Sequence, residues 1–201
     1  MIQWPIEITH GDVTLRPLKV SDRKEWNEVQ VRNRTWLQPW QATLPSGQKA
    51  SESFLDHLRY HNRQARQGRD YGLAIIHEGS FAGGITLGNV NWGSARNAYL
   101  GYWIDQARAG RGITPTAVAM LTDWALTVAG LHRIEVAIRP ENAASIRVVE
   151  KLGFLQEGYR VRFLHIDNDW RDHVVYVITE EQVQQQKLTS KRPRIHSRHV
   201  V

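Results

Sequence analysis

The chain has 201 residues, of which 41% are hydrophobic and 23% charged, so it can bury one substantial core and nothing in it requires a second domain. It has no cysteine, which excludes disulfides, thiolate metal ligands and a cysteine nucleophile. No apolar run approaches the roughly 18 residues of a membrane span, and the first residues show neither a basic region nor a cleavage site. We therefore expect a cytoplasmic protein.

The net charge of +6 is concentrated at the C-terminal end. Residues 187–201 contain five basic residues and no acid, which leaves +1 on the first 186 residues. Because this segment lacks apolar periodicity, we expect one domain over residues 1–186 and a disordered basic tail over residues 187–201. Contact with the ribosome or RNA through phosphates is one interpretation of the tail; a solubilising extension is the other. The basic residues are Lys187, Lys191, Arg192, Arg194 and Arg198.

The first half of the chain alternates between strand and helix patterns. A helix is expected from Ser21, as its N-cap, through about Arg32. A second helix is expected over Ser51–Gln67, with Gly68 as its stop. The other elements expected here are a strand at Val13–Pro17, an aromatic loop at Thr35–Trp40, and an antiparallel hairpin of Tyr71–His77 with Phe81–Asn89.

The second half continues the alternation. A strand over Ala98–Asp105 precedes a helix whose buried face is formed by residues at spacings of four, three and four, and which stops at Gly130. The whole pattern predicts a mixed α/β (α+β) fold with a central, largely antiparallel sheet. The face residues are Ala117, Leu121, Trp124 and Val128, and the later elements are a strand at His132–Arg139, a helix at Asn142–Lys151 stopped by Gly153, and a hairpin of Gln156–His165 with Trp170–Thr179.

A turn containing two glycines connects the strand ending at Asp105 to the next helix. Gly110 and Gly112 let the backbone turn sharply, and the helix opening at Thr114 aims the positive end of its dipole the same way. This arrangement is typical of a phosphate or pyrophosphate site, although an ordinary turn remains an alternative. A dinucleotide fingerprint would need a third glycine where Pro115 stands, and no P-loop sequence is present.

Taken with the segment His132–Phe154, this turn resembles the acyl-CoA site of the GNAT superfamily of N-acetyltransferases. The stretch Glu157–His173 is similar to the branch that acetylates the N-terminal alanine of ribosomal proteins. The resemblance extends over about Val13–Thr179 and implies the GNAT fold, in which two neighbouring strands splay apart and the pantetheine arm of acetyl-CoA lies between them.

The resemblance also implies which residues contact acetyl-CoA. The strand backbone pairs with pantetheine, and the turn binds the pyrophosphate mainly through N–H groups. One departure from the family pattern is Ala107, where Gln or Arg is frequent. The implied contacts are Tyr102, Trp103 and Ile104 for pantetheine; Gly110, Arg111, Gly112, Ile113 and Thr114 for the pyrophosphate; and Asn142 and Ser145 near the thiol.

Catalytic roles follow from the same comparison. Asn142 lies beside the pantetheine in the family reading, and Ser145 could protonate the departing sulfur, because the tyrosine used by a related branch is replaced by Val149. Asn142 as a simple N-cap is the structural alternative. Glu135 is the candidate base, directly or through water, although the related branch has its glutamate at the position of Ala137. Pairing with an arginine is the alternative for Glu135.

Aromatic residues suggest where the acceptor binds. Trp36 and Trp40 could form an apolar wall, and Trp170 and Arg171 lie near the turn of the last hairpin; core or lid packing is the alternative. His57 and His61 are spaced as in a zinc protease, but the following residue is not the required glutamate. We interpret these histidines as part of a solvated face and expect no metal site.

The leading functional hypothesis is an acetyl-CoA-dependent N-terminal acetyltransferase acting on a small-subunit ribosomal protein, with alanine as the expected acceptor, by direct sequential transfer. An α-amine with a pKa near 8 costs only about 1 kcal/mol to deprotonate at pH 7, against about 4.6 for lysine, so a weak base or water suffices. The alternatives are acetylation of a small amine, such as an antibiotic or polyamine, and a non-catalytic ribosome- or RNA-binding module.

Overall fold

The computed structural model describes residues 4–45 and 53–188 of the chain. One eight-stranded sheet, with the order β1-β2-β3-β4-β5-β6-β8-β7, forms its centre, and every neighbouring pair is antiparallel except β5 with β6. The expected fold class is confirmed. The strands are β1 (Ile8–His10), β2 (Val13–Arg16), β3 (Tyr71–His77), β4 (Ser80–Asn91), β5 (Asn97–Ile104), β6 (Arg133–Ile138), β7 (Leu155–Ile166) and β8 (Asp169–Thr179).

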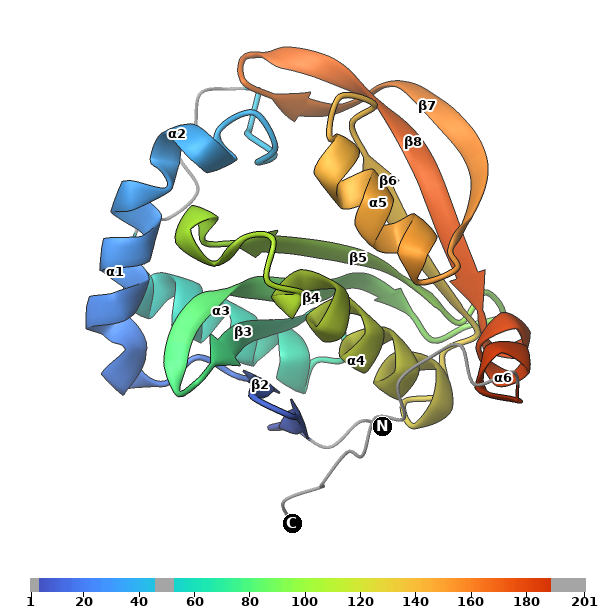
Figure 1. Cartoon of the computed structure of the whole chain (residues 1–201), viewed down its shortest axis with the longest axis horizontal. Coiled ribbons are helices and arrows are strands. Elements are labelled where there is room, and N and C mark those ends of the chain that lie inside the picture. Colours follow the sequence, from blue (N-terminus) through green and yellow to red (C-terminus); the bar gives the residue numbers. More distant parts are fainter. Residues whose placement is uncertain (1–3, 46–52, 189–201) are drawn as a thin grey trace.

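Helices cover both faces of this sheet (Figure 1). Alternate residues of β3 point to opposite faces: Leu73 and Ile75 join the large cluster that contains α4, whereas Ala74 and Ile76 join a smaller one with Trp26 of α1. The helices are α1 (Arg23–Arg32), α2 (Arg34–Leu37), α3 (Phe54–Arg66), α4 (Ile113–Thr127), α5 (Ala143–Lys151) and α6 (Glu180–Leu188), with 3-10 turns η1 (Val20–Asp22) and η2 (Gln106–Arg108).

The parallel strands β5 and β6 are paired only over their first three residues. Their register joins residues 97–99 to residues 133–135, whereas β5 continues to Ile104 and β6 to Ile138 without further pairing. Figure 1 shows the two strands diverging, with α5 beside β6. The splay implied by the family resemblance is therefore present, and it leaves one edge of β5 without a strand neighbour.

Helix α4 is buried more completely than the spacing of its apolar residues predicted. Every residue from Ala117 to Leu126 is buried, since the helix packs on β1, β2, β5 and β6 and also against α5 and α6. Val128, which was expected on the buried face, lies beyond the last helical residue and is 48% exposed. The prediction for Val128 was wrong because the helix ends before it.

The N-terminal elements differ from the sequence prediction in three places. Ser21 is not an N-cap, since it lies inside η1; the carboxylate of Asp22 instead accepts the N–H of Lys19 at 2.7 Å. Helix α2 occupies part of the segment expected as an aromatic loop. Strand β1 was not predicted, and its three residues are too few to give a clear alternation.

Helix α6 was also not predicted, and it continues two residues into the basic segment. Residues 189–201 lie outside the described residues, so the expectation of a disordered tail stays a prediction. Within the described ranges, none of the helices has the length and apolar character needed to cross a membrane.

Candidate active site

The turn after β5 contains a row of backbone donors, and its residues 110–112 are exposed. Gly110 and Gly112 have φ angles of +77° and +80°, and a Cβ atom added at either would meet nothing within 4 Å. Among the hydrogen bonds of the described residues, none uses the N–H groups of residues 110–114. We call residues 109–114 the phosphate turn, because unpaired N–H groups on an open surface suit an anionic ligand.

Helix α4 adds to this preference for an anion. Its N-cap is Gly112, which has no side chain to satisfy the first N–H groups, and its first turn contains no acid. The free N–H groups and the helix dipole therefore act on the same exposed region. Every pyrophosphate contact expected from the sequence lies on this turn.

The two segments singled out from the sequence meet across the splay. The hydroxyl of Tyr102 on β5 donates to the main-chain oxygen of Ser145 at 3.3 Å, in the first turn of α5. Burial raises the pKa of Tyr102 to about 12, against the lowering effect of a hydrogen bond with the side chain of Ser145. The phenol is therefore protonated at neutral pH.

Asn142 is the N-cap of α5, as the structural alternative proposed. Its side-chain oxygen accepts the N–H of Ser145 at 3.1 Å, which fixes the start of the helix. This role does not compete with one beside the pantetheine. Tyr102, Asn142 and Ser145 thus form one cluster at the opening between β5 and β6.

Trp103 points to the opposite face of the sheet from Tyr102. Its indole packs edge-on against Phe81 at 5.8 Å and lies so close to Gly84 that a Cβ there would be 2.6 Å from the indole nitrogen. Only the backbone of Trp103 is therefore a candidate for contact with pantetheine. Ile104, the last residue of β5, pairs with Gly83 of β4.

Glu135 is buried and surrounded by donors. Its carboxylate accepts from Arg160 at 2.8 Å, from Arg133 at 3.4 Å and from Asn97 at 3.3 Å. It stands opposite Tyr99, where β5 and β6 are still paired, and not in the open part of the splay. These contacts favour the structural alternative, in which Glu135 ties β6 to β7 and β5.

The segment after α2 joins the turn between β7 and β8. The N–H of Thr43 donates to the main-chain oxygen of His165 at 2.8 Å, and Ala42 forms an isolated bridge with Ile166. The side chain of Gln38 donates to Asp167 at 2.8 Å. In Figure 1, α2 accordingly lies beside the end of the last hairpin.

These contacts bring the four expected acceptor residues into one region. Trp36 and Trp170 are exposed. Arg139, at the end of β6, holds the aromatic segment by donating to Pro39 at 2.7 Å and lying over the ring of Trp40. Arg171 lies on β8 beside Trp170, where it pairs with Asp169 at 3.4 Å.

The interpretation of His57 and His61 as a solvated face was wrong. Both line a cavity of about 70 Å³ between α3 and the sheet, together with Trp26 and Trp103. Burial lowers the pKa of His57 to about 4 and also lowers that of His61. The spacing contained this signal, because the two histidines continue the inward face that begins with Phe54.

One group of potential metal ligands occurs in the described ranges, formed by Asp12, His77 and Glu78. The guanidinium of Arg108 donates to Nδ1 of His77 at 3.1 Å, so a positive charge already occupies this side of the ring. The group is therefore better suited to hold the guanidinium of Arg108 than to bind a metal cation.

A splayed strand pair, a helix N-terminus with free donors and a cluster around Ser145 together define a fold that binds an acyl-CoA. The family model described as the acetyltransferase (GNAT) domain matches residues 12–155. The chain belongs to this family of acetyltransferases.

Individual relatives agree with this assignment. The chain is 31% identical to the [ribosomal protein uS5]-alanine N-acetyltransferase of Escherichia coli, covering 80% of this chain and 84% of the relative. It matches Mycobacterium smegmatis RimJ in complex with CoA-disulfide with a TM-score of 0.84 and 33% identity, over 94% of this chain and 96% of the other. The RimL acetyltransferase of ribosomal L7/L12, solved with coenzyme A, shares the fold at a TM-score of 0.77 and 21% identity, over 88% and 99%.

The family assignment confirms the enzyme class expected from the sequence. The protein is an N-acetyltransferase whose co-substrate is acetyl-CoA. The free N–H groups of the phosphate turn and the open space at its two glycines fit the pyrophosphate of that co-substrate.

Proposed function

We propose that this enzyme transfers the acetyl group of acetyl-CoA directly to the N-terminal α-amine of a small-subunit ribosomal protein, with alanine as the acceptor residue, in the cytoplasm. The observation that carries the proposal is the wall formed by the segment after α2 and the β7–β8 turn, joined by Thr43 and His165. It stands at the end of β6, next to Trp36 of α2 and Trp170 of β8, which are both exposed. The relative that acetylates the alanine of uS5 supports the acceptor class.

The co-substrate would be held by backbone groups. The N–H groups of residues 110–114 would bind the pyrophosphate, and the free edge of β5 at Tyr102, Trp103 and Ile104 would pair with the pantetheine amides. Asn142 fixes the first turn of α5, which holds the backbone of Ser145 in a constant position. When bound, acetyl-CoA supplies the activated acetyl group.

Ser145 is proposed as the general acid. In the transfer, the amine nitrogen forms a bond to the acetyl carbon, the carbon–sulfur bond breaks, and the Ser145 hydroxyl gives a proton to the departing sulfur. The amine releases one proton to solvent and the Ser145 oxygen takes one up from solvent, so that the hydroxyl is restored and the transfer balances. Because a terminal amine with a pKa near 8 costs only about 1 kcal/mol to deprotonate at pH 7, no strong base is required.

Glu135 is accordingly proposed as a structural residue and not as the base. Its carboxylate already forms ion pairs with Arg160 and Arg133. Trp36, Trp40, Trp170 and Arg171 are proposed to form the wall that receives the acceptor peptide.

Mass spectrometry of small-subunit ribosomal proteins incubated with the enzyme and isotopically labelled acetyl-CoA tests this function. One N-terminus is expected to gain a labelled acetyl group, and the Gly112→Val enzyme provides the matched control. Labelling of spermidine or of another small amine, with no labelled protein terminus, would replace the proposal by the small-amine alternative.

A further inference from the structure

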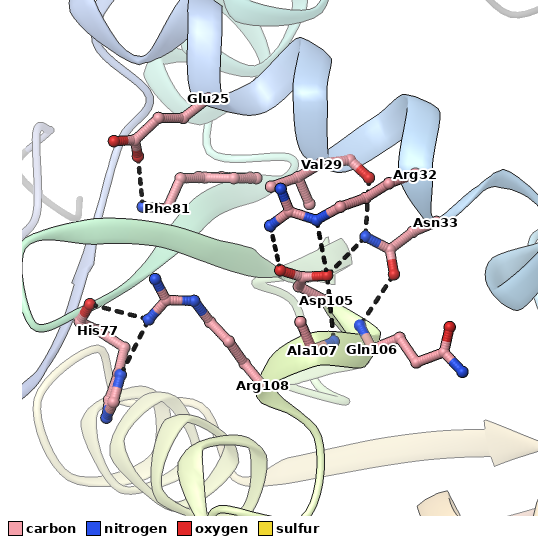
Figure 2. A network of polar contacts seen from close by, with 10 residues as sticks. All are labelled: Glu25, Val29, Arg32, Asn33, His77, Phe81, Asp105, Gln106, Ala107 and Arg108. Atoms are coloured by element: carbon pink, nitrogen blue, oxygen red, sulfur yellow. Dashed lines mark hydrogen bonds and ion pairs between the residues drawn. The ribbon is translucent and has the colours of Figure 1, made fainter.

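Strand β5 leads to a buried polar pair that the sequence analysis did not single out. Asp105 and Asn33 are each only 1% exposed, and Figure 2 shows them facing each other between α1 and the approach to the phosphate turn. The carboxylate of Asp105 accepts from the side-chain nitrogen of Asn33 at 2.8 Å and forms an ion pair with Arg32. These partners hold the pKa of Asp105 below its usual value against the raising effect of burial.

Asn33 uses all parts of its side-chain amide. The nitrogen donates to the main-chain oxygen of Val29 and to Asp105, both at 2.8 Å, and the oxygen accepts the N–H of Gln106 at 2.8 Å. An aspartate or leucine of similar shape could not make all three contacts. The amide therefore links the end of α1 to the first residue of η2.

Each of the three residues of η2 is held by a hydrogen bond to a side chain outside this turn. The partners are Asn33, Asp105 and His77. Gln106 donates its N–H to Asn33, and Ala107 donates its N–H to Asp105 at 3.3 Å. Arg108 donates to Nδ1 of His77 at 3.1 Å and to its main-chain oxygen at 3.3 Å (Figure 2). The next residue begins the phosphate turn, whose own N–H groups from residue 110 to 114 bond to no described residue.

We propose that Asp105 and Asn33 are positioning residues for the phosphate turn. They hold η2 in place, so that the donors of residues 110–114 converge before the ligand arrives. Binding to a preformed turn avoids the entropy of ordering it, and loss of the anchor is expected to weaken the affinity for CoA without changing the chemistry near Ser145. The inference rests on the proposed role of the turn in binding acetyl-CoA.

The chain contains a matched control at the other end of α1. Asp22 is also buried, pairs with Arg16 at 2.7 Å and accepts the N–H of Lys19 at 2.7 Å. The two aspartates thus have the same kind of partners. They are separated by α1, whose ten residues span about 15 Å, and only Asp105 contacts η2.

The test compares Asp105→Asn with Asp22→Asn. We expect Asp105→Asn to weaken CoA binding by about tenfold in calorimetric titration, with a similar rise in KM for acetyl-CoA and kcat within about twofold, as for the loss of charged hydrogen bonds. Asp22→Asn should lower the melting temperature comparably and leave CoA affinity within about twofold. Equal effects of the two variants on CoA affinity would overturn the proposal.

Two further variants keep the outcome decisive. Should Asp105→Asn fail to fold, Arg32→Gln removes the half-exposed partner of the carboxylate and is expected to weaken CoA binding in the same direction; unchanged affinity there also contradicts positioning. Gly112→Val distinguishes the role of the phosphate turn in binding CoA from the positioning role of Asp105. Retained CoA affinity in Gly112→Val contradicts the role of the turn, whereas lost affinity there with normal affinity in Asp105→Asn contradicts only the positioning role.

Discussion

Tyr102 on β5 reaches across the splayed strands to the main-chain oxygen of Ser145, and this 3.3 Å hydrogen bond joins the two segments that form the catalytic region. Because Asn142 caps the same helical turn, Ser145 is held from both sides through its backbone. The side-chain hydroxyl of Ser145 lies beside the phenol of Tyr102 and is the group proposed to protonate the sulfur.

Replacing Ser145 with alanine is expected to lower turnover by roughly ten- to a thousandfold, because one general acid is lost. CoA affinity should change much less, since both Asn142 and Tyr102 contact the backbone of Ser145. Steady-state kinetics and calorimetric titration measure the two effects. Ser94→Ala, on the exposed β4–β5 connection, is the control. Unchanged turnover in Ser145→Ala would show that water or another group protonates the sulfur.

Gly112→Val is expected to abolish measurable CoA binding while the protein stays folded. The φ angle of +80° strains any β-branched residue, and the new side chain would project from the turn into the space proposed for the pyrophosphate. Gly130→Val is the matched control, with φ +75°, equally open surroundings and a position beyond the other end of α4. If the two variants bind CoA equally well, the phosphate turn has been misassigned.

The phosphate turn and the start of α5 could be predicted from sequence because their chemistry depends on local features. Gly110, Gly112 and the Asn142 cap specify backbone geometry within a few residues. The splay between β5 and β6 was implied by the family resemblance and not by any residue pattern. Strand alternation alone contains no information on where pairing stops.

Asn33 and Asp105 were missed for a different reason. They are 72 positions apart, and each reads as an ordinary polar residue at the end of an element. Their importance depends on the tertiary contact that buries both. The interpretation of His57 and His61 was wrong because it relied on their polarity. Their spacing places both on the inward face of α3.

Glu135→Gln is expected to leave the acidic limb of the pH–rate profile unchanged and to lower stability. The substitution removes the negative charge that faces Arg133 and Arg160, and such losses cost about 1–3 kcal/mol when the pair is partly buried. Chemical denaturation and a pH–rate series measure both quantities. A shifted acidic limb in a stable variant would instead identify Glu135 as the base.

His57 makes stability fall as the medium becomes acidic. Its pKa in the folded protein is about 4, because of burial and the neighbouring His61, against 6.5 when unfolded. The unfolded state therefore binds more protons between these values, and stability is lost as pH falls from about 6.5 to 4, by at most about 3 kcal/mol. His57→Gln should flatten this part of the stability curve.

Chemical denaturation of the wild type and of His57→Gln, each measured at a series of pH values from 7.5 to 4.5, tests this prediction. His132→Gln is the control, because His132 is half exposed and its ring contacts Glu181 at the surface. Parallel stability curves for wild type and His57→Gln would mean that the imidazole is solvated in solution.

The basic tail is expected to tether the enzyme to the ribosome and to take no part in the reaction. Because α6 continues to Leu188, the deletion that leaves this helix intact removes residues 189–201 and, with them, four of the five basic residues of the tail. Turnover on a short N-terminal peptide should stay within about twofold. Ribosome binding should weaken, and its salt slope should flatten by at most about 2.8, taking roughly 0.7 per charge.

A full-length variant with Lys191, Arg192, Arg194 and Arg198 changed to glutamine separates charge from length. If the tail acts through phosphate contacts, this variant should bind ribosomes as weakly as the truncated enzyme, because the counterions released on binding depend on charge and not on chain length. Ribosome pelleting over a series of salt concentrations measures the slope. Equal affinity and equal salt dependence in all three proteins would leave the tail as a solubilising extension, and a large loss of peptide turnover in the truncated enzyme would place the tail against the catalytic domain.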